Sequence, residues 1–152
     1  MAKGKRSWLK KILVTGLILA VIGGGIYWYI ATEKFAATKD RKAAFTVNAI
    51  DFIREFRKDD SASNRKYAKK IISVNGIISD LESPDSATIN IKFIDTTTSD
   101  YIIFAFQEQY LAEAKSVKIG DSVSVKGACT GSIYSDLLDA YNIGFIRSTL
   151  NK

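Results

Sequence analysis

The longest apolar stretch of the chain lies near its N-terminus and runs from Ile12 to Ala31, twenty consecutive residues without a charged side chain. An α-helix needs about 20 apolar residues to cross the core of a bilayer. A cleaved signal peptide usually has a shorter apolar region, of about 7–15 residues, followed by small residues at the cleavage site. The bulky Tyr29 and Phe35 stand where such a site needs small side chains. The pattern therefore predicts an uncleaved, single-pass transmembrane helix over residues 12–31.

A helical period follows this stretch, and it predicts a second helix over residues 33–58. Its apolar residues recur at i, i+4, i+7, i+8 and i+11, which places them on one stripe of a helix: Phe45, Ala49, Phe52, Ile53 and Phe56. We expect this stripe to face a packed core. The polar segment Asp59–Asn64 predicts a loop or a weak break that ends the amphipathic helix.

The period then changes to alternation, which is typical of β-strands. Five strands are expected, with their apolar positions at Ile72 to Ile78, Ile89 to Phe93, Ile102 to Phe106, Val123 to Val125, and Leu137 to Ile146. Between the third and fourth strands, residues 107–116 carry Tyr110, Leu111 and Ala114 at helical spacing, so a short helix is predicted there. The element order is therefore a lead-in helix followed by β-β-β-α-β-β.

This order is that of an OB-fold, a five-stranded, partly open barrel with a helix between its third and fourth strands. Gly76 lies within the first strand, where a glycine marks a bulge or a sharp bend. An α+β sheet packed on the amphipathic helix shares these strands and differs in closure; we favour the barrel. The expected organisation is a basic N-terminus at 1–11, a transmembrane helix at 12–31, a juxtamembrane and amphipathic segment at 32–64, and an OB-fold domain at 65–152.

The flanking basic residues predict how the helix is oriented, because lysine and arginine are retained on the cytoplasmic side of a membrane. Five precede the apolar stretch, namely Lys3, Lys5, Arg6, Lys10 and Lys11, and four follow it, namely Lys34, Lys39, Arg41 and Lys42. We therefore predict a single-pass protein of the bacterial inner membrane. Its N-terminus is expected in the cytoplasm, and its C-terminal domain in the periplasm or otherwise outside the cytoplasm.

Charge is divided unevenly between the two halves of the remaining chain. Residues 33–70 hold 11 basic and 6 acidic residues, a net charge of +5, whereas residues 71–152 hold 6 and 10, a net charge of −4. A basic juxtamembrane segment is attracted to anionic lipid headgroups, although a solvated helix face explains the same charges. The acidic body repels polyphosphate, which argues against nucleic acid as a partner.

The residue types that most enzymes and metal sites need are scarce. The sequence has no histidine, the commonest general base and transition-metal ligand, and a single cysteine, Cys129, which excludes an intramolecular disulfide. Cys129 lies in G-A-C-T-G, which resembles a nucleophile elbow but lacks a histidine partner. Because it shares strand parity with Val123 and Val125, we expect a buried structural thiol.

Two other patterns have simpler explanations than chemistry. Ser63–Lys66 fits S-x-x-K, but the partner motifs of that active site are missing. The carboxylate pairs Asp59–Asp60 and Asp136–Asp139 lack the spacing of a dedicated calcium loop and are expected to be solvated turns. We therefore predict no catalytic residues, no metal site and no cofactor, and we do not expect an enzyme.

Two segments resemble one known family. These are Y-A-K-K-I-I-S-V-N-G-I-I-S-D-L at 67–81 and I-G-D-S-V-S-V-K-G-A-C-T-G at 119–131, which are similar to the tRNA_anti-like OB-fold family of bacterial, Bacteroidetes-type membrane-anchored or lipoprotein-like proteins. The resemblance covers roughly residues 45–147 and implies an N-terminal anchor, a lead-in helix and a barrel. The lipobox cysteine of many relatives is missing, as is a second cysteine near Tyr141 and Asn142. The family's name reflects a fold relation to anticodon-binding domains, and a fold does not imply a function.

OB-folds that bind nucleic acid combine a basic groove with aromatic side chains on strands two and three. The outward residues here would be Thr88, Asn90, Lys92, Tyr101, Ile103 and Ala105. One lysine and one tyrosine make a poor nucleic-acid surface. We instead predict a ligand or partner surface at Lys92, Tyr101 and Ile103, together with Tyr134, which is placed in the loop between strands four and five.

The function expected from the sequence is that of a membrane-anchored extracytoplasmic binding or scaffolding module without catalytic activity. Its partners would be envelope proteins, a glycan, or a membrane complex that the anchor joins. Gly16, Gly23 and Gly24 would suit close packing of such a helix, although they would equally suit neutral filler. The alternative is a membrane-tethered nucleic-acid-binding protein. The location of the C-terminal domain discriminates between the two, and the sequence does not indicate the oligomeric state.

Overall fold

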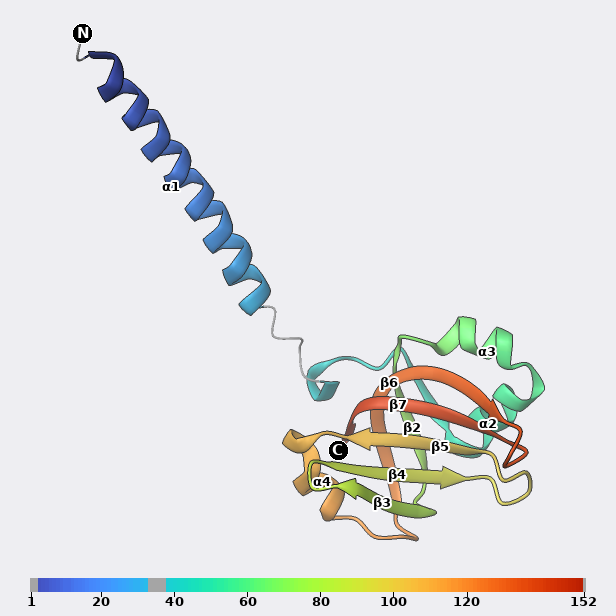
Figure 1. Cartoon of the computed structure of the whole chain (residues 1–152). Helices are drawn as coiled ribbons and strands as arrows, with labels where there is room; N and C mark the ends of the chain where they lie inside the picture. The colour runs from blue at the N-terminus through green and yellow to red at the C-terminus, as the bar shows by residue number, and fades with distance from the viewer. Residues whose placement is uncertain (1–2, 33–37, 152) are drawn as a thin grey trace. The chain divides into compact units, whose positions relative to one another are not determined.

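A computed structural model describes residues 3–32 and 38–151 of the chain (Figure 1). Contacts divide the chain into two compact units, residues 1–37 and residues 38–152. Each unit is described below by itself.

The first unit is the helix α1, Lys3–Thr32, which includes the predicted apolar helix. Its segment Ser7–Tyr29 spans 23 residues with a mean hydropathy of 1.9, and none of its most apolar part is buried against protein. This helix is long and apolar enough to cross a membrane, and an N-terminal signal sequence would satisfy the same criterion. Nothing lies within 4 Å of the point where a side chain would begin at Gly16, Gly23 or Gly24.

The second unit contains the remaining described elements. In chain order they are η1 (Thr38–Asp40), β1 (Phe45–Asn48), α2 (Ala49–Lys58), α3 (Asp60–Tyr67), β2 (Ile71–Ile77), β3 (Asp80–Asp85), β4 (Thr88–Ile94), β5 (Tyr101–Phe106), η2 (Glu108–Tyr110), α4 (Leu111–Lys115), β6 (Ser122–Ser135) and β7 (Ala140–Leu150).

The strands form one mainly antiparallel sheet with the order β1-β2-β6-β7-β5-β4-β3. The pairs β1–β2 and β5–β7 are parallel. The mainly β domain expected from the sequence is confirmed, but the described sheet has seven strands rather than five and its ladder does not close. β2 and β3 follow each other in the chain but lie toward opposite ends of the strand order. The two residues between them bond to different neighbours: Ile78 N donates to Asp121 O, just before β6, at 3.0 Å, and Ser79 N donates to Lys92 O of β4 at 2.9 Å.

The predicted helix over 33–58 is wrong over residues 38–48 and confirmed from Ala49 to Lys58. Residues 33–37 lie outside the described residues, and Phe45–Asn48 form β1, which pairs in parallel with β2. The β-branched Thr46 and Val47 suit a strand. The helix begins only at Ala49, because the Asn48 side chain accepts a hydrogen bond from Ile50 N at 3.0 Å and so caps its first turn.

The polar segment Asp59–Asn64 ends the amphipathic helix as expected, since α2 ends at Lys58, but it is a break and not a loop, because Asp60–Tyr67 form α3. Asp59 is the cap of this helix, and its carboxylate accepts a hydrogen bond from Ala62 N at 2.9 Å. Tyr67 anchors the helix: its buried ring packs edge-on against Phe52 of α2 at 4.9 Å between ring centroids. One cap and one aromatic contact therefore turn a polar stretch into a helix.

The strand boundaries differ from the sequence-based expectation in three places. β3 was not expected, since it is largely exposed and contains Pro84. β6 is much longer than Val123 to Val125. The last strand begins at Ala140 instead of Leu137, because Leu137 and Leu138 lie in the turn before it, exposed to 93% and 57%.

The core lies between the sheet and the helices that cover it. The alternation predicted for β4 and β5 is confirmed, because Ile91, Phe93, Ile102, Phe104 and Phe106 are all buried. α2 and α4 lie near opposite ends of β5 (Figure 1). The side chains of Phe52, Ile53 and Phe56 bring the apolar stripe of α2 into this core, as expected.

Two arginines fix α2 to the turn that joins β4 and β5. Arg54 Nε lies 3.2 Å from Asp95 Oδ2, and Arg57 donates to both oxygens of Asp100 at 2.8 and 2.9 Å. Asp100 is fully buried and also accepts a hydrogen bond from Tyr141 N at 2.9 Å. The helix is thus held by its charged face as well as by its apolar stripe.

Candidate ligand-binding surface

The side of β3, β4, β5, β7 and β6 that faces away from the core forms a continuous surface, which we call the outer face. Residues opposite each other in a ladder share a side of the sheet. One row runs Asp80–Lys92–Ile103–Gly144 from β3 to β7. The next row runs Ile94–Tyr101–Asn142–Ile133 from β4 to β6. The structure therefore brings Lys92, Tyr101 and Ile103 together on adjacent strands.

Lys92 is engaged by its neighbours on this face. Its ammonium group lies 3.8 Å from Asp80 Oδ2 and donates a hydrogen bond to Glu82, and both carboxylates come from the unexpected strand β3. The nitrogen also lies 5.4 Å from the centroid of the Tyr101 ring. Its side chain is only 16% exposed. Two neighbouring carboxylates offset the positive potential of this lysine, so its attraction for a phosphate is weak.

The second row of the outer face is apolar and aromatic. Tyr101 is half-buried, as is Ile103 of the first row, and Ile133 at the far end of the second row is 74% exposed. Between Tyr101 and Ile133 lies Asn142, whose side-chain oxygen is buried without a hydrogen-bond partner in the described part of the chain. An unpaired acceptor of this kind costs free energy until a donor reaches it. The exposed part of this row, with Tyr101 and Ile133, suits a ligand that brings apolar groups.

Tyr134 lies on a different surface from the other three predicted residues. It belongs to β6, not to a loop, and it stands opposite Tyr141 in the β6–β7 hairpin, with 5.0 Å between the ring centroids. Adjacent strand residues point to opposite sides, so Tyr134 faces away from Ile133. Its hydroxyl donates to Asp139, a hydrogen bond that raises the pKa of Tyr134 above the usual value for tyrosine.

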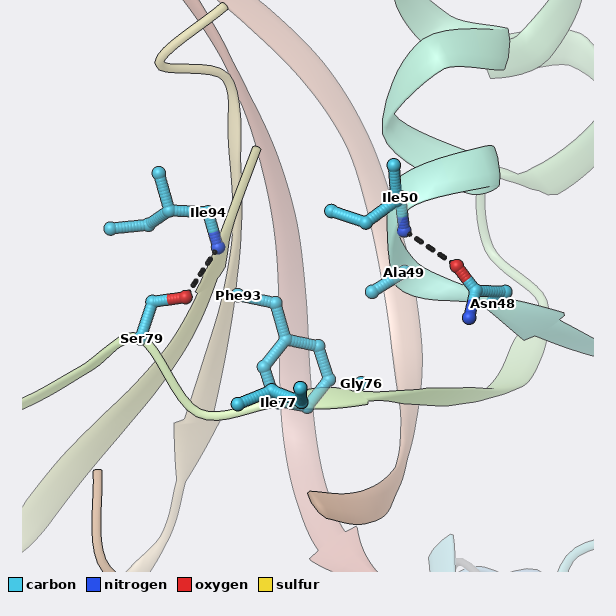
Figure 2. A pocket seen from close by; sticks show the side chains of 8 residues that line it. All are labelled: Asn48, Ala49, Ile50, Gly76, Ile77, Ser79, Phe93 and Ile94. Atoms are coloured by element: carbon cyan, nitrogen blue, oxygen red, sulfur yellow. Dashed lines mark hydrogen bonds between the residues drawn. The ribbon is translucent and has the colours of Figure 1, made fainter. Parts of the chain in front are cut away.

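A small pocket lies where α2 meets β2 and β4 (Figure 2). It has a volume of about 240 Å³ and is lined mainly by apolar side chains, among them Ile50, Ile77, Phe93 and Ile94. Ligand pockets usually enclose 300–1,000 Å³. Gly76 makes the tight packing here possible, because a Cβ atom at this position would lie 2.8 Å from Ala49 Cβ and from the Phe93 ring. We interpret the pocket as a packing feature between the helix and the sheet.

The residues considered for chemistry lie apart from one another. Cys129 is buried, as predicted, and burial raises the pKa of its thiol to about 11. Asp59 caps α3, and Ser63 is buried beneath the same helix, where its hydroxyl donates to Glu55 O at 3.1 Å. Among residues 3–32 and 38–151, no three histidine, cysteine or carboxylate side chains gather as a metal site would require.

Sequence reasoning missed the two features that define the outer face. The acidic rim of Asp80 and Glu82 belongs to a strand that polarity and Pro84 concealed. The exposed Ile133 belongs to a segment of β6 that extends well beyond the strand expected around Val123 and Val125, whereas the exposed Ile146 lies at the end of the expected last strand. An alternating pattern from Ser122 to Ser135 would have been the available signal, but the interruption of the ladder pairing between Cys129 and Gly131 breaks it.

The model of the tRNA_anti-like family matches residues 1–138 of the chain. The chain belongs to the tRNA_anti-like family. This confirms the resemblance found in its sequence and places the domain among OB-like folds. No curated protein matches this tRNA_anti-like chain at a significant level.

Among solved structures, the tRNA_anti-like domain is similar to a protein from Klebsiella pneumoniae subsp. pneumoniae MGH 78578, provisionally described as a nucleic acid-binding lipoprotein. The two chains are 15% identical, and the match covers 70% of this chain and 91% of the other, with a TM-score of 0.55. At this level of identity the likeness shows a shared fold.

Proposed function

We propose that the protein is a membrane-anchored, extracytoplasmic binding or scaffolding module without catalytic activity, and that its outer face takes a protein or small ligand. The observation that carries the proposal is the state of Lys92, which has Asp80 and Glu82 as partners on a face that also carries Tyr101, Ile103 and Ile133. α1 supports the anchor by its length and hydropathy. The flanking basic residues support the extracytoplasmic location.

We further infer that the domain acts as a five-stranded OB barrel with β1 added at one edge. In this interpretation β2 and β3 are the two halves of one bent first strand. The hydrogen bonds of Ile78 to Asp121 and of Ser79 to Lys92 support it, since they continue the pairing with β6 and β4 across the bend. The outer face then corresponds to the side of an OB-fold that most often carries ligands.

The alternative is a membrane-tethered nucleic-acid-binding protein. It is favoured by the description of the Klebsiella protein, which shares the fold, and by the basic residues of α3. It is disfavoured by the outer face, where a nucleic acid would need unpaired cations and would meet the carboxylates of Asp80 and Glu82 instead.

Photo-crosslinking in intact cells tests the proposal. A photoreactive amino acid would replace Ile103 or Ile133 in the full-length chain, and Ser86, which is exposed in the turn between β3 and β4, would serve as the control position. We expect Ile103 and Ile133 to crosslink the same envelope component, and Ser86 not to do so. Crosslinks to RNA or DNA from the two isoleucine positions, or identical products from all three positions, would contradict it.

A further inference from the structure

Basic side chains gather around one aromatic ring at the edge of the domain. Lys66 and Lys70 place their ammonium nitrogens 5.8 and 5.3 Å from the centroid of the Phe45 ring. Lys69 lies between them in the chain, and Lys42 precedes Ala44, whose N–H donates to Ile71 O at 2.7 Å. All four lysines are exposed. We call Lys42, Lys66, Lys69 and Lys70, together with Phe45, the basic cluster.

The charges of the basic cluster are mostly unpaired. Lys66 lies 2.7 Å from Glu55, whereas no carboxylate in the described residues pairs with Lys42, Lys69 or Lys70. Lys70 donates instead to the Lys66 backbone oxygen at 2.5 Å. The contrast with Lys92 is therefore clear: the outer face neutralises its lysine, while the basic cluster leaves its lysines open to an anionic partner.

The cluster also lies close to the point where the chain enters the domain. The entering segment is held against β6, because Lys126 donates to Lys39 O at 2.7 Å and to Arg41 O at 3.0 Å. Only five residues separate Thr32, the last residue of α1, from Thr38. A chain spans at most about 3.6 Å per residue, so a connection of this length reaches no farther than roughly 20 Å.

We propose that the basic cluster docks the domain on the surface of the bilayer that holds its own anchor, by contact with anionic phospholipid headgroups. Each lysine near an anionic membrane surface contributes attraction that decays within a Debye length. The tether keeps the cluster at a high effective concentration next to that surface, so a few lysines are enough. The body of the domain, residues 71–152, has a net charge of −4 and is repelled from the same surface.

The chemistry favours a membrane over a nucleic acid as the occupant. The basic cluster has four lysines, two of them beside the Phe45 ring, and these make too few phosphate contacts to hold a nucleic acid that is free to diffuse away at physiological salt. Single-strand binding also requires several aromatic platforms along a basic groove, whereas the ring beside Lys66 and Lys70 is that of Phe45, with the buried Tyr67 packed against it. A domain that is already tethered to a membrane needs neither many phosphate contacts nor aromatic platforms to dock on that membrane. This inference rests on the proposed membrane anchor but not on the ligand of the outer face.

The test uses the full-length chain in lipid nanodiscs. A fluorophore attached at Ala44→Cys, an exposed position next to Phe45, would report contact with headgroup-labelled quencher lipids. The native Cys129 is buried, and its raised thiol pKa of about 11 disfavours labelling there. Nanodiscs of phosphatidylcholine alone would be compared with nanodiscs that also contain phosphatidylglycerol, at low and high salt. Recovery of the chain in phosphatidylcholine nanodiscs reports the anchor separately.

We expect quenching to be stronger with phosphatidylglycerol and to fall with added salt. The variant Lys69→Gln/Lys70→Gln should weaken docking by about fivefold for each lysine, roughly 25-fold in total. The matched control Lys58→Gln/Lys118→Gln, which changes two exposed lysines outside the cluster, should dock like the wild type. Quenching that ignores phosphatidylglycerol, or that falls equally in both variants, would overturn the proposal. So would an oligonucleotide that displaces the domain from the lipid and binds through the cluster.

Discussion

At the scale of single residues, the two surfaces of the domain differ in whether their cations already have partners. Lys92 contacts Asp80, Glu82 and Tyr101, so its charge is neutralised within the sheet. Lys69 and Lys70 have no carboxylate partner among the described residues, so their charges are free to act on something outside the protein. A count of lysines in the sequence does not distinguish a paired lysine from an unpaired one. The carboxylate partners in the folded chain distinguish them, and these partners come from other strands and turns.

The lowered pKa of the Asp95 carboxyl makes the stability of the domain depend on pH. Its pKa is held below the usual value by the Thr97 backbone N–H, which donates to it at 3.0 Å, and by Arg54. A carboxyl whose pKa is lowered by folding stabilises the folded state above its unfolded pKa, and that stabilisation is lost as pH falls through the folded pKa. The free energy of unfolding should therefore decrease on acidification below about pH 4.

Denaturant unfolding of the full-length chain in detergent at several pH values measures this effect. Asp95→Asn should lower stability at neutral pH and flatten the decrease in acid, because the titrating group is gone. Asp136→Asn, at an exposed position, should keep the decrease of the wild type. An unchanged acid dependence in Asp95→Asn would show that other carboxyls govern it.

At the scale of elements, α2 is held by its apolar stripe, by the Arg54–Asp95 ion pair and by an ion pair between Arg57 and the fully buried Asp100. Arg57 bonds both oxygens of Asp100, which is fully buried and also accepts from Tyr141 N. Asp100 thereby connects the helix, the β4–β5 turn and the start of β7. This connection holds α2 at the end of the sheet where Phe52 and Phe56 complete the core.

Replacement of Arg57 should destabilise the domain even though Arg57 itself is exposed. Arg57→Met keeps much of the side-chain length but leaves the Asp100 carboxylate buried with fewer partners, which costs about 1–3 kcal/mol. Arg65→Met changes an exposed arginine of α3 whose guanidinium donates to Ser61 Oγ at 2.8 Å, and it should cost less than about 0.5 kcal/mol. Thermal unfolding followed by circular dichroism compares them. Equal stabilities of the two variants would contradict this role of the ion pair.

The elements that could be predicted from the sequence are those whose pattern is local. β4 and β5 are each buried on one side, so every second residue is apolar. α2 is also buried on one side, so its apolar residues Phe52, Ile53 and Phe56 recur at a spacing of three or four. β1 depends on its pairing with β2, and α3 depends on a cap and on the contact of Tyr67 with Phe52. Such contacts between distant residues leave no periodic signal.

The candidate site was predictable only in part for the same reason. Lys92, Tyr101 and Ile103 share a face because β4 and β5 alternate, and the sequence shows that alternation. Tyr134 was grouped with them without knowledge of the β6–β7 register, which turns it to the other side of the hairpin. The carboxylates that neutralise Lys92 come from β3, an edge strand whose polar residues and Pro84 lack the alternating pattern of a half-buried strand.

At the scale of the whole molecule, the chain combines an apolar helix with an OB-like domain of the tRNA_anti-like family. We propose that this domain works outside the cytoplasm, where its outer face contacts envelope partners and nucleic acid is not a routine ligand. The positive-inside bias behind this claim is small, five basic residues against four. Location is therefore the property that most needs a direct measurement.

That measurement is the topology of the C-terminus, with reporters fused after Lys152 in the full-length chain. One reporter would be active only outside the cytoplasm, and a matched reporter only inside it. We predict activity of the first and silence of the second, with the chain retained in the membrane fraction. Activity of the cytoplasmic reporter alone would contradict the account and would make the membrane-tethered nucleic-acid-binding protein the leading hypothesis.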